Sequence, residues 1–212
     1  MSSSTPLRIE DAGPDRKARR LVFGDKDVTR LTSAAAVRSI GLEDGGSVDR
    51  EAVENALAEH EPSLAKEAAL RLLGYRDRAT VELKRRLADS GYPQPVVDAL
   101  LERLTEWGLV DDERFARAWV RTRARAGLGA RRISHELAQK GVARDLAALV
   151  LAEELPRESE LDAAVMSLRG ATASDRKQRD RLVRRLVARG HALSVAIAAV
   201  DSVPSAGEGE VE

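Results

Sequence analysis

The side chains that most often perform chemistry are few and scattered in this sequence. The three histidines, His60, His135 and His191, lie far apart, and none has a second histidine four residues away to complete a metal-binding pair. The acidic run at residues 111–113 (Asp-Asp-Glu) has the ligand type for a divalent cation. The simpler interpretation is the acidic first turn of a helix beginning near residue 113, where negative charge stabilises the helix end. We therefore predict no metal site.

Signals for nucleotide chemistry and for nucleophilic catalysis are also missing. No loop of the form G-x-x-x-x-G-K-[ST] is present. Residues 127–129 (Gly-Leu-Gly) resemble the start of a dinucleotide fingerprint, but no strand precedes them, so a turn between helices is the better interpretation. Cysteine is absent, which removes thiolate nucleophiles, thiolate metal ligands and disulfides together. We predict a protein that is not an enzyme and needs no cofactor.

Arginine is the residue type whose spacing carries the strongest functional signal. Residues 113–144 hold nine Lys or Arg against two Glu, and residues 176–189 hold seven against one Asp. Arginine binds phosphates and carboxylates with a planar fork, so two such clusters favour a polyanion-facing surface over ordinary solvated helix faces. The candidate phosphate-facing residues are Arg114, Arg117, Arg121, Arg125, Arg131, Arg132, Lys140, Arg181, Arg184, Arg185 and Arg189.

The elements that must position these arginines repeat three times. Each unit has a basic helix with two aliphatic residues four apart, and a glycine follows four residues after the second: Gly91, Gly141 and Gly190. Aliphatic residues at this spacing share one helix face. A glycine just past the last turn adopts the left-handed conformation that ends a helix. With one more apolar helix before it and one after it, each unit is predicted to contain three helices.

The predicted core follows from the same repeat. Three aromatic residues, Trp107, Phe115 and Trp119, are expected to cluster where the first and second repeats meet, and Tyr75 and Tyr92 to seal the first repeat. The complete predicted structural core is Leu83, Leu87, Gly91, Trp107, Phe115, Trp119, Ile133, Leu137, Gly141, Leu182, Leu186 and Gly190.

The N-terminal part has a different pattern. Short β-type runs at residues 7–9, 21–23 and 28–31 predict strands, Ser33 is a plausible N-cap of a short helix, and Asp49 is a plausible N-cap of a second helix. The predicted fold is mainly α, with three tandem three-helix repeats in an elongated arc after a small mixed subdomain. The predicted ranges are 1–6 (disordered start), 7–60 (mixed subdomain), 64–112, 113–157 and 158–203 (repeats), and 204–212 (disordered acidic tail).

Composition places the chain in a broad class. Charged residues make up 33%, and no stretch is long and apolar enough for a transmembrane helix, so we expect a cytoplasmic protein with no membrane partner. The formal net charge is zero overall, but residues 1–63 carry 9 basic and 12 acidic residues while residues 64–203 carry 26 and 20. A basic helical body suggests a polyanionic partner.

Several segments resemble the RecX family of recombinase regulators. Residues 108–116 (Gly-Leu-Val-Asp-Asp-Glu-Arg-Phe-Ala), with the later Ile133 and residues 140–142 (Lys-Gly-Val), resemble that family's most recognisable segment. Residues 69–91 are similar to its opening repeat and residues 176–197 to its third repeat. One departure is His191, where the family usually has an aromatic residue after the glycine.

The resemblance implies a right-handed helical arc that lies in the groove of a RecA filament, in contact with RecA and with the single-stranded or duplex DNA inside the filament. There it would inhibit strand exchange, ATP turnover and the co-protease role, as a monomer without catalytic residues, and so regulate DNA repair, recombination and the SOS response. Two alternatives remain open: a helix-turn-helix regulator that binds duplex DNA, and a helical adaptor that does not respond to DNA.

Overall fold

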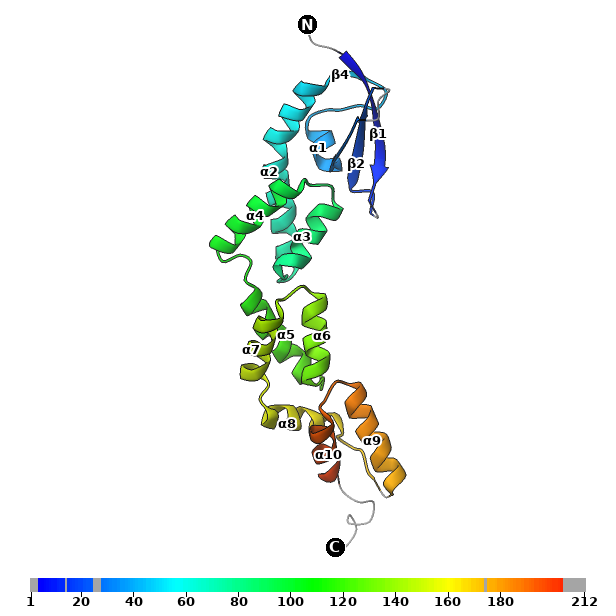
Figure 1. Ribbon diagram of the computed structural model, residues 1–212, viewed down its shortest axis with the longest axis vertical. Helices are drawn as coiled ribbons and strands as arrows, with labels where there is room; N and C mark the ends of the chain where they lie inside the picture. The colour runs from blue at the N-terminus through cyan, green and yellow to red at the C-terminus, as the bar shows by residue number, and fades with distance from the viewer. Residues whose placement is uncertain (1–3, 14, 25–27, 174, 204–212) are drawn as a thin grey trace. The chain divides into compact units, whose positions relative to one another are not determined.

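The structure is a computed structural model that describes residues 4–13, 15–24, 28–173 and 175–203. The chain divides into two compact units, Met1–Asp111 and Asp112–Glu212 (Figure 1). No helix in the described part of the chain is long and apolar enough to cross a membrane. The predicted tail at residues 204–212 lies outside the described residues.

The first unit begins with a four-stranded antiparallel sheet. Its strands are β1 (Ser4–Ala12), β2 (Ala18–Phe23), β3 (Val28–Ser33) and β4 (Ser47–Asp49), in the order β3-β2-β1-β4. Leu7 pairs with Phe23 and Ile9 pairs with Leu21, and Leu7, Leu21 and Phe23 are buried against the helices of this unit. The three predicted strands are thus present, with a fourth that the sequence pattern did not indicate.

The start of β1 corrects one expectation. Residues 4–6, which we predicted to be disordered, are the part of β1 that pairs with β4: Ser4 with Asp49, Thr5 with Val48, and Pro6 with Ser47. Proline lacks a backbone N–H, but the Pro6 carbonyl accepts a hydrogen bond from Gly24 N at 2.9 Å. This segment is ordered because the short strand β4, which is only three residues long, supplies its hydrogen-bonding partners.

Both predicted caps of the next helices are confirmed. Ser33 accepts a hydrogen bond from Ala36 N at the start of α1 (Ala34–Ser39), and Asp49 accepts one from Glu51 N at 3.0 Å at the start of α2 (Arg50–Tyr75). Helix α2 continues through Pro62 across the predicted boundary at residues 60–64, so one helix serves both the sheet and the first repeat. Buried Glu61 links helix α2 to β3, because its carboxylate accepts hydrogen bonds from Arg30 and Thr32.

The three-helix groups follow in order. The first consists of the C-terminal part of α2 with α3 (Thr80–Asp89) and α4 (Gln94–Glu106), around Leu83, Leu87 and Leu104. The second unit holds α5 (Asp112–Arg125), α6 (Ala130–Gln139) and α7 (Arg144–Glu154), with Ile133 and Leu137 fully buried. The second unit also holds α8 (Arg157–Ser167), α9 (Arg176–Ala188) and α10 (Leu193–Asp201), which pack around a hydrophobic cluster of their own. The predicted fold class, mainly helical with a small N-terminal sheet, is confirmed.

The repeated glycine turns have the same geometry in all three groups. Gly91, Gly141 and Gly190 follow α3, α6 and α9 with φ of 91°, 84° and 95°, in the left-handed region. In each turn the glycine N–H bonds the carbonyl three residues back, and the next N–H bonds the carbonyl five residues back, for example Gly190 N to Val187 O at 2.9 Å and His191 N to Leu186 O at 3.2 Å. This is the Schellman end of a helix.

The aromatic residues differ from the predicted core. Phe115 is buried, and its ring stacks on that of Trp119 at a centroid distance of 5.7 Å. Trp107, in contrast, is 46% exposed, with Lys66 and Arg103 over its ring. Tyr92 is buried as expected, but Tyr75 is 82% exposed. Both corrected residues lie at the end of a helix, where a side chain has fewer neighbours to cover it.

Candidate nucleic-acid interface

The second unit joins its two three-helix groups end to end through backbone hydrogen bonds. At the start of α6, Gly129 N donates to Arg189 O and Arg131 N donates to Gly190 O, both at 3.1 Å. Between them, Ala130 N donates to the carboxylate of Glu160 on α8 at 3.2 Å. The first N–H groups of a helix have no partner within the helix. The turn after α9 and the Glu160 side chain therefore cap α6.

This joint requires glycine at two positions. A Cβ on Gly129 would lie 2.2 Å from His191 N, and a Cβ on Gly190 would lie 2.4 Å from the Cβ of Arg132. Non-bonded carbon atoms prefer separations of about 3.5–4.0 Å. The repeated glycine thus has two roles at position 190, ending α9 and allowing the backbone of the third group to approach α6.

Two side chains of the third group complete the joint at the C-terminal end of α5. Arg189 donates from Nε to Gly127 O at 3.0 Å and from a terminal nitrogen to Ala126 O at 2.5 Å. His191 is fully buried, and its Nε2 lies 3.1 Å from Gly127 O, so this nitrogen carries the proton. Cations are favoured at helix C-termini. Arg189 and His191 therefore hold the third group against the second.

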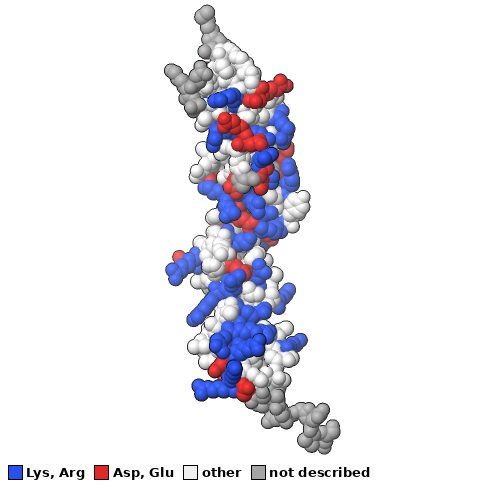
Figure 2. All heavy atoms as spheres, turned by 90° about the vertical axis from the view of Figure 1, so that its right-hand side faces the viewer, with Lys and Arg blue, Asp and Glu red and all other residues white. Residues whose placement is uncertain are grey.

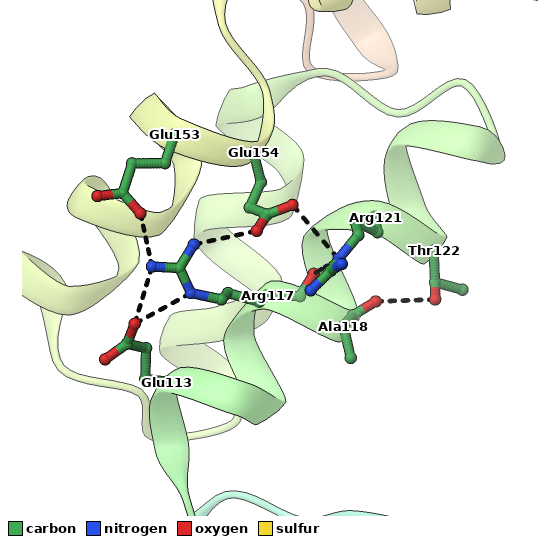
Figure 3. A network of polar contacts seen from close by, with 7 residues as sticks. All are labelled: Glu113, Arg117, Ala118, Arg121, Thr122, Glu153 and Glu154. Atoms are coloured by element: carbon green, nitrogen blue, oxygen red, sulfur yellow. Dashed lines mark hydrogen bonds and ion pairs between the residues drawn. The ribbon is translucent and has the colours of Figure 1, made fainter.

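The arginine stripe predicted on α5 is largely engaged within the unit. Arg117 contacts three carboxylates, those of Glu113 at 2.8 Å, Glu153 at 2.6 Å and Glu154 at 3.0 Å, and Arg121 contacts Glu154 at 3.3 Å (Figure 3). These carboxylates raise the pKa of Arg117 above its usual value, first through Glu113. Glu153 and Glu154 belong to α7, so they neutralise charge that α5 alone would present to a partner.

Trp119 organises a second cluster of engaged cations. Its indole N–H donates to Glu136 at 3.2 Å, and Arg123 and Lys140 lie over its ring at 4.4 and 5.2 Å. Arg123 also pairs with Glu136 at 2.8 Å. Cation–π and ion-pair contacts of this kind stabilise packing between helices. Lys140, predicted to face phosphate, therefore has a structural contact with α5.

The exposed arginines of α6 and α9 form the strongest basic surface of this unit. Helix α9 contains six Lys or Arg and one Asp. Figure 2 shows Lys and Arg side chains gathered, with few Asp or Glu between them, on the face of this unit to which α6 and α9 contribute. We call Arg131, Arg132, Arg181, Arg184 and Arg185 the α6–α9 surface; all five are exposed.

The side chains of the α6–α9 surface differ in how freely they can contact a partner. Arg132 pairs with Glu136 at 3.3 Å, Arg184 donates to Asp180 O, and Arg185 donates to Ser167 O. Arg131 and Arg181 make no side-chain hydrogen bond or ion pair within the described ranges, and the same holds for exposed Arg125 on α5. These three guanidinium groups are available to an anionic partner without breaking an internal contact.

The sequence did not indicate the acidic residues and the histidine that determine which side chains are engaged within the second unit. Glu153 and Glu154 were outside the counted window, although they lie on the helix that packs on α5. Glu160 and His191 were not expected to be buried, yet Glu160 is 8% exposed and His191 is fully buried. The available signal was an unusual His at the repeat position after Gly190, directly beside the turn that docks on α6.

The residues considered for metal or nucleotide chemistry have structural roles in this unit. Among the described residues, no group of three or more His, Asp or Glu side chains is placed to hold a metal ion. Asp112 and Glu113 lie in the first turn of α5, and residues 127–129 form the turn between α5 and α6. Both simpler interpretations from the sequence are confirmed. The fold and its repeated turns thus define a class of protein built from tandem three-helix units.

Known proteins share these units. Two family models match, the second three-helix domain of RecX over residues 111–151 and the first over residues 65–104. The regulatory protein RecX of Mycobacterium ulcerans is 41% identical over 145 residues, covering 64% of this chain and 84% of that protein. The regulatory protein RecX of Mycolicibacterium smegmatis is 40% identical over 155 residues, covering 69% and 82%.

Solved structures agree on the fold. The crystal structure of RecX from Lactobacillus salivarius matches with a TM-score of 0.63 at 19% identity, over 68% of this chain and 96% of that one. A second crystal structure of a RecX regulatory protein matches with a TM-score of 0.60, over 94% and 100%. The chain belongs to the RecX family of regulatory proteins, and its role is regulatory.

Proposed function

We propose that this protein inhibits a RecA recombinase by binding the RecA–DNA filament, with the α6–α9 surface against phosphates or acidic groups of the filament. The family supports the regulatory role, and the sequence resemblance supplies the recombinase as partner. The observation that carries the proposal is the exposed arginines of α6 and α9, with Arg131 and Arg181 free of internal partners in the described part of the chain. Through this contact the protein would regulate DNA repair and recombination in the cytoplasm.

Rigid positioning supports this surface as the contact. Because Gly190 and Arg189 bind the start of α6 and the end of α5, the arginines of two three-helix groups are held in fixed relation within the second unit. Because the backbones of the two groups are already fixed, binding need not order them relative to each other, and each guanidinium group can contact a phosphate through two hydrogen bonds. An extended anionic polymer is the partner that such a row of charges fits best.

The test is RecA ATPase and strand exchange on single-stranded DNA, with and without this protein, beside a gel shift on naked duplex DNA. The proposal predicts inhibition of both RecA activities, and binding to the filament that weakens by about 0.7–0.9 log units per phosphate contact for each tenfold rise in salt. Unchanged RecA activity at saturating protein would contradict it.

The two rival functions predict different results in the same experiment. A helix-turn-helix regulator would bind naked duplex tightly and sequence-selectively, and would leave the recombinase ATPase unaffected. A helical adaptor would show neither inhibition nor any effect of DNA. Sedimentation of the protein alone tests the expectation of a monomer.

A further inference from the structure

The first unit contains a basic cavity that the sequence did not indicate. It lies where the start of β2, helix α1 and the end of α2 meet, and has a volume of about 460 Å³. Ser33, Ala34 and Tyr92 line it together with exposed basic side chains, and no Asp or Glu is among its described lining residues. The cationic and aromatic lining residues are Arg16, Lys17, Arg19, Arg38, Arg71 and Tyr75.

Four of these cations are available to a ligand. Arg38 on α1 and Arg71 on α2 are exposed, and neither side chain has a hydrogen bond or ion pair with any residue that the structure describes. Arg16 and Lys17 pair with Asp11 at 3.6 Å and Asp15 at 3.7 Å, but their side chains are 82% and 65% exposed. Ion pairs this exposed are weak and exchange readily for a stronger anion.

Arg19 differs from these four cations, because its side chain stabilises the turn at the edge of the cavity. Its side chain is 25% exposed, donates to Arg16 O at 2.6 Å and pairs with Asp11 at 3.1 Å. Arg16 has a φ of 53°, in the left-handed region that side chains rarely adopt. The contact from Arg19 to the carbonyl of this residue holds the turn that brings Arg16 and Lys17 to the cavity.

The two tyrosines of the cavity also differ. Tyr92 is buried, its hydroxyl donates to Leu64 O at 3.2 Å, and burial raises the pKa of Tyr92. It is part of the folded core. Tyr75 lines the same cavity as Arg71 and Lys17 and is 82% exposed, so its ring is open to solvent. An open aromatic ring beside cations is the arrangement on which bases of single-stranded nucleic acids stack.

We propose that this cavity binds a single-stranded nucleic acid, with phosphates on Arg38, Arg71 and Lys17 and a base stacked on Tyr75. An acidic protein segment would satisfy the cations but has no need of the exposed ring. A base on Tyr75 and the adjoining phosphates use both features together. The site lies in the first unit and does not depend on the α6–α9 surface, so it holds or fails independently of the proposed function.

The experiment measures binding of the full-length protein to fluorescein-labelled oligothymidine of about 15 nucleotides, a length within the range that one single-strand-binding module covers. All variants carry Arg131→Gln and Arg181→Gln, which lowers the contribution of the α6–α9 surface equally in each. Tyr75→Ala is expected to weaken binding roughly five- to hundredfold, the range for removal of one stacked base, while Tyr75→Phe retains it. Arg38→Ala with Arg71→Ala should lower the salt slope by about 0.7 for each phosphate that these arginines neutralise.

The matched control is Arg86→Ala. Arg86 is an exposed arginine on α3 of the same unit that has no side-chain partner among the described residues and does not line the cavity, so its replacement should leave oligothymidine binding unchanged. Circular dichroism confirms that each variant is folded. Equal affinity and salt slope for all cavity variants would overturn the proposal. So would binding of a polyglutamate peptide that needs Arg38 and Arg71 while oligothymidine binding needs none of the cavity residues.

Discussion

Helices α5 and α9 contain similar rows of arginines but use them differently. On α5, Arg117 and Arg121 contact Glu113, Glu153 and Glu154, so their charge stabilises the packing of α5 with α7. On α9, Arg181 has no internal partner in the described residues, and the acid on the same helix, Asp180, offers Arg184 its backbone carbonyl. Similar rows of arginines thus form an internal network in one place and an exposed basic surface in the other.

The difference comes from the neighbouring helix. Helix α7 ends with Glu153 and Glu154 beside α5, whereas α10, which packs on α9, carries one acid, Asp201, which pairs with Arg179. An arginine within reach of a carboxylate in its own fold must give up that contact before it binds a partner. Free arginines bind phosphate without this cost. Three kinds of substitution test this difference. They disrupt the contact between α9 and α6, remove the ion pairs of α5 with α7, or replace the exposed arginines that have no partner.

The largest effect is expected from Gly190→Ala, which disrupts the joint that holds α9 against α6. The new Cβ would lie 2.4 Å from the Cβ of Arg132 and 2.5 Å from its backbone nitrogen, at a φ of 95°. Strain and displacement together should cost about 3 kcal/mol or more of unfolding free energy. Urea denaturation measures the loss.

The matched control is Gly170→Ala, in the turn after α8. Gly170 has a φ of 74°, and a Cβ there meets nothing within 4 Å, so only the left-handed backbone is penalised, by about 1–2 kcal/mol. Equal losses for the two variants would show that the close approach of Gly190 to α6 contributes nothing.

A smaller loss of stability is expected from Arg117→Gln. The change removes a cation from three carboxylates, and leaves Glu153 and Glu154 as like charges next to each other on α7. The melting temperature should fall, and added salt should narrow the gap to the unchanged protein because it screens the remaining repulsion. Arg125→Gln serves as the comparison, because Arg125 is an exposed arginine of the same helix without a side-chain partner among the described residues. A melting temperature that does not move would mean that the network in Figure 3 does not hold α5 to α7.

His191→Phe should lower the unfolding free energy by a smaller amount still. It restores the aromatic residue that the resemblance leads one to expect, but removes the hydrogen bond from Nε2 to Gly127 O. Gly127 O keeps its contact with Arg189, so the carbonyl is not left without a partner, and the loss should be about 1 kcal/mol. Unfolding free energy from denaturation gives the value. A loss as large as that of Gly190→Ala would show that the histidine, and not the backbone, holds the joint.

The smallest change in stability is expected from Arg131→Gln and Arg181→Gln. Because both side chains are exposed and without partners in the described residues, each should alter the unfolding free energy by less than about 0.5 kcal/mol. A clear destabilisation of either variant, seen as a lower urea midpoint, would mean that these arginines belong to the folded network as Arg117 does.

Local patterns predicted much of this fold. The aliphatic spacing and the glycines at 91, 141 and 190 identified all three helix ends, because a Schellman turn depends on residues within one segment. Ser33 and Asp49 were identifiable as caps for the same reason. Strand β4 and the continuous helix α2 were not, because both depend on distant partners: β4 pairs with β1, and Glu61 binds β3.

The candidate site could be predicted only in part. The sequence indicated which helices are basic, but not that α7 carries the carboxylates for Arg117 or that Arg189 binds the end of α5. These are contacts between residues more than thirty positions apart, and no local pattern encodes them. The cavity beside Tyr75 was hidden for the same reason, since residues 1–63 are acidic on average and its cations come from three separate elements.

In the proposed complex the α6–α9 surface, and not the row of arginines on α5, contacts the filament. The most direct measurement is the salt dependence of binding to RecA filaments on single-stranded DNA for two double variants, Arg131→Gln with Arg181→Gln, and Arg117→Gln with Arg121→Gln. We predict that the first pair weakens binding at least about tenfold and flattens the salt slope by roughly 1.4–1.8 if each arginine meets one phosphate, while the second pair keeps both. The opposite pattern, or equal effects, would contradict the account.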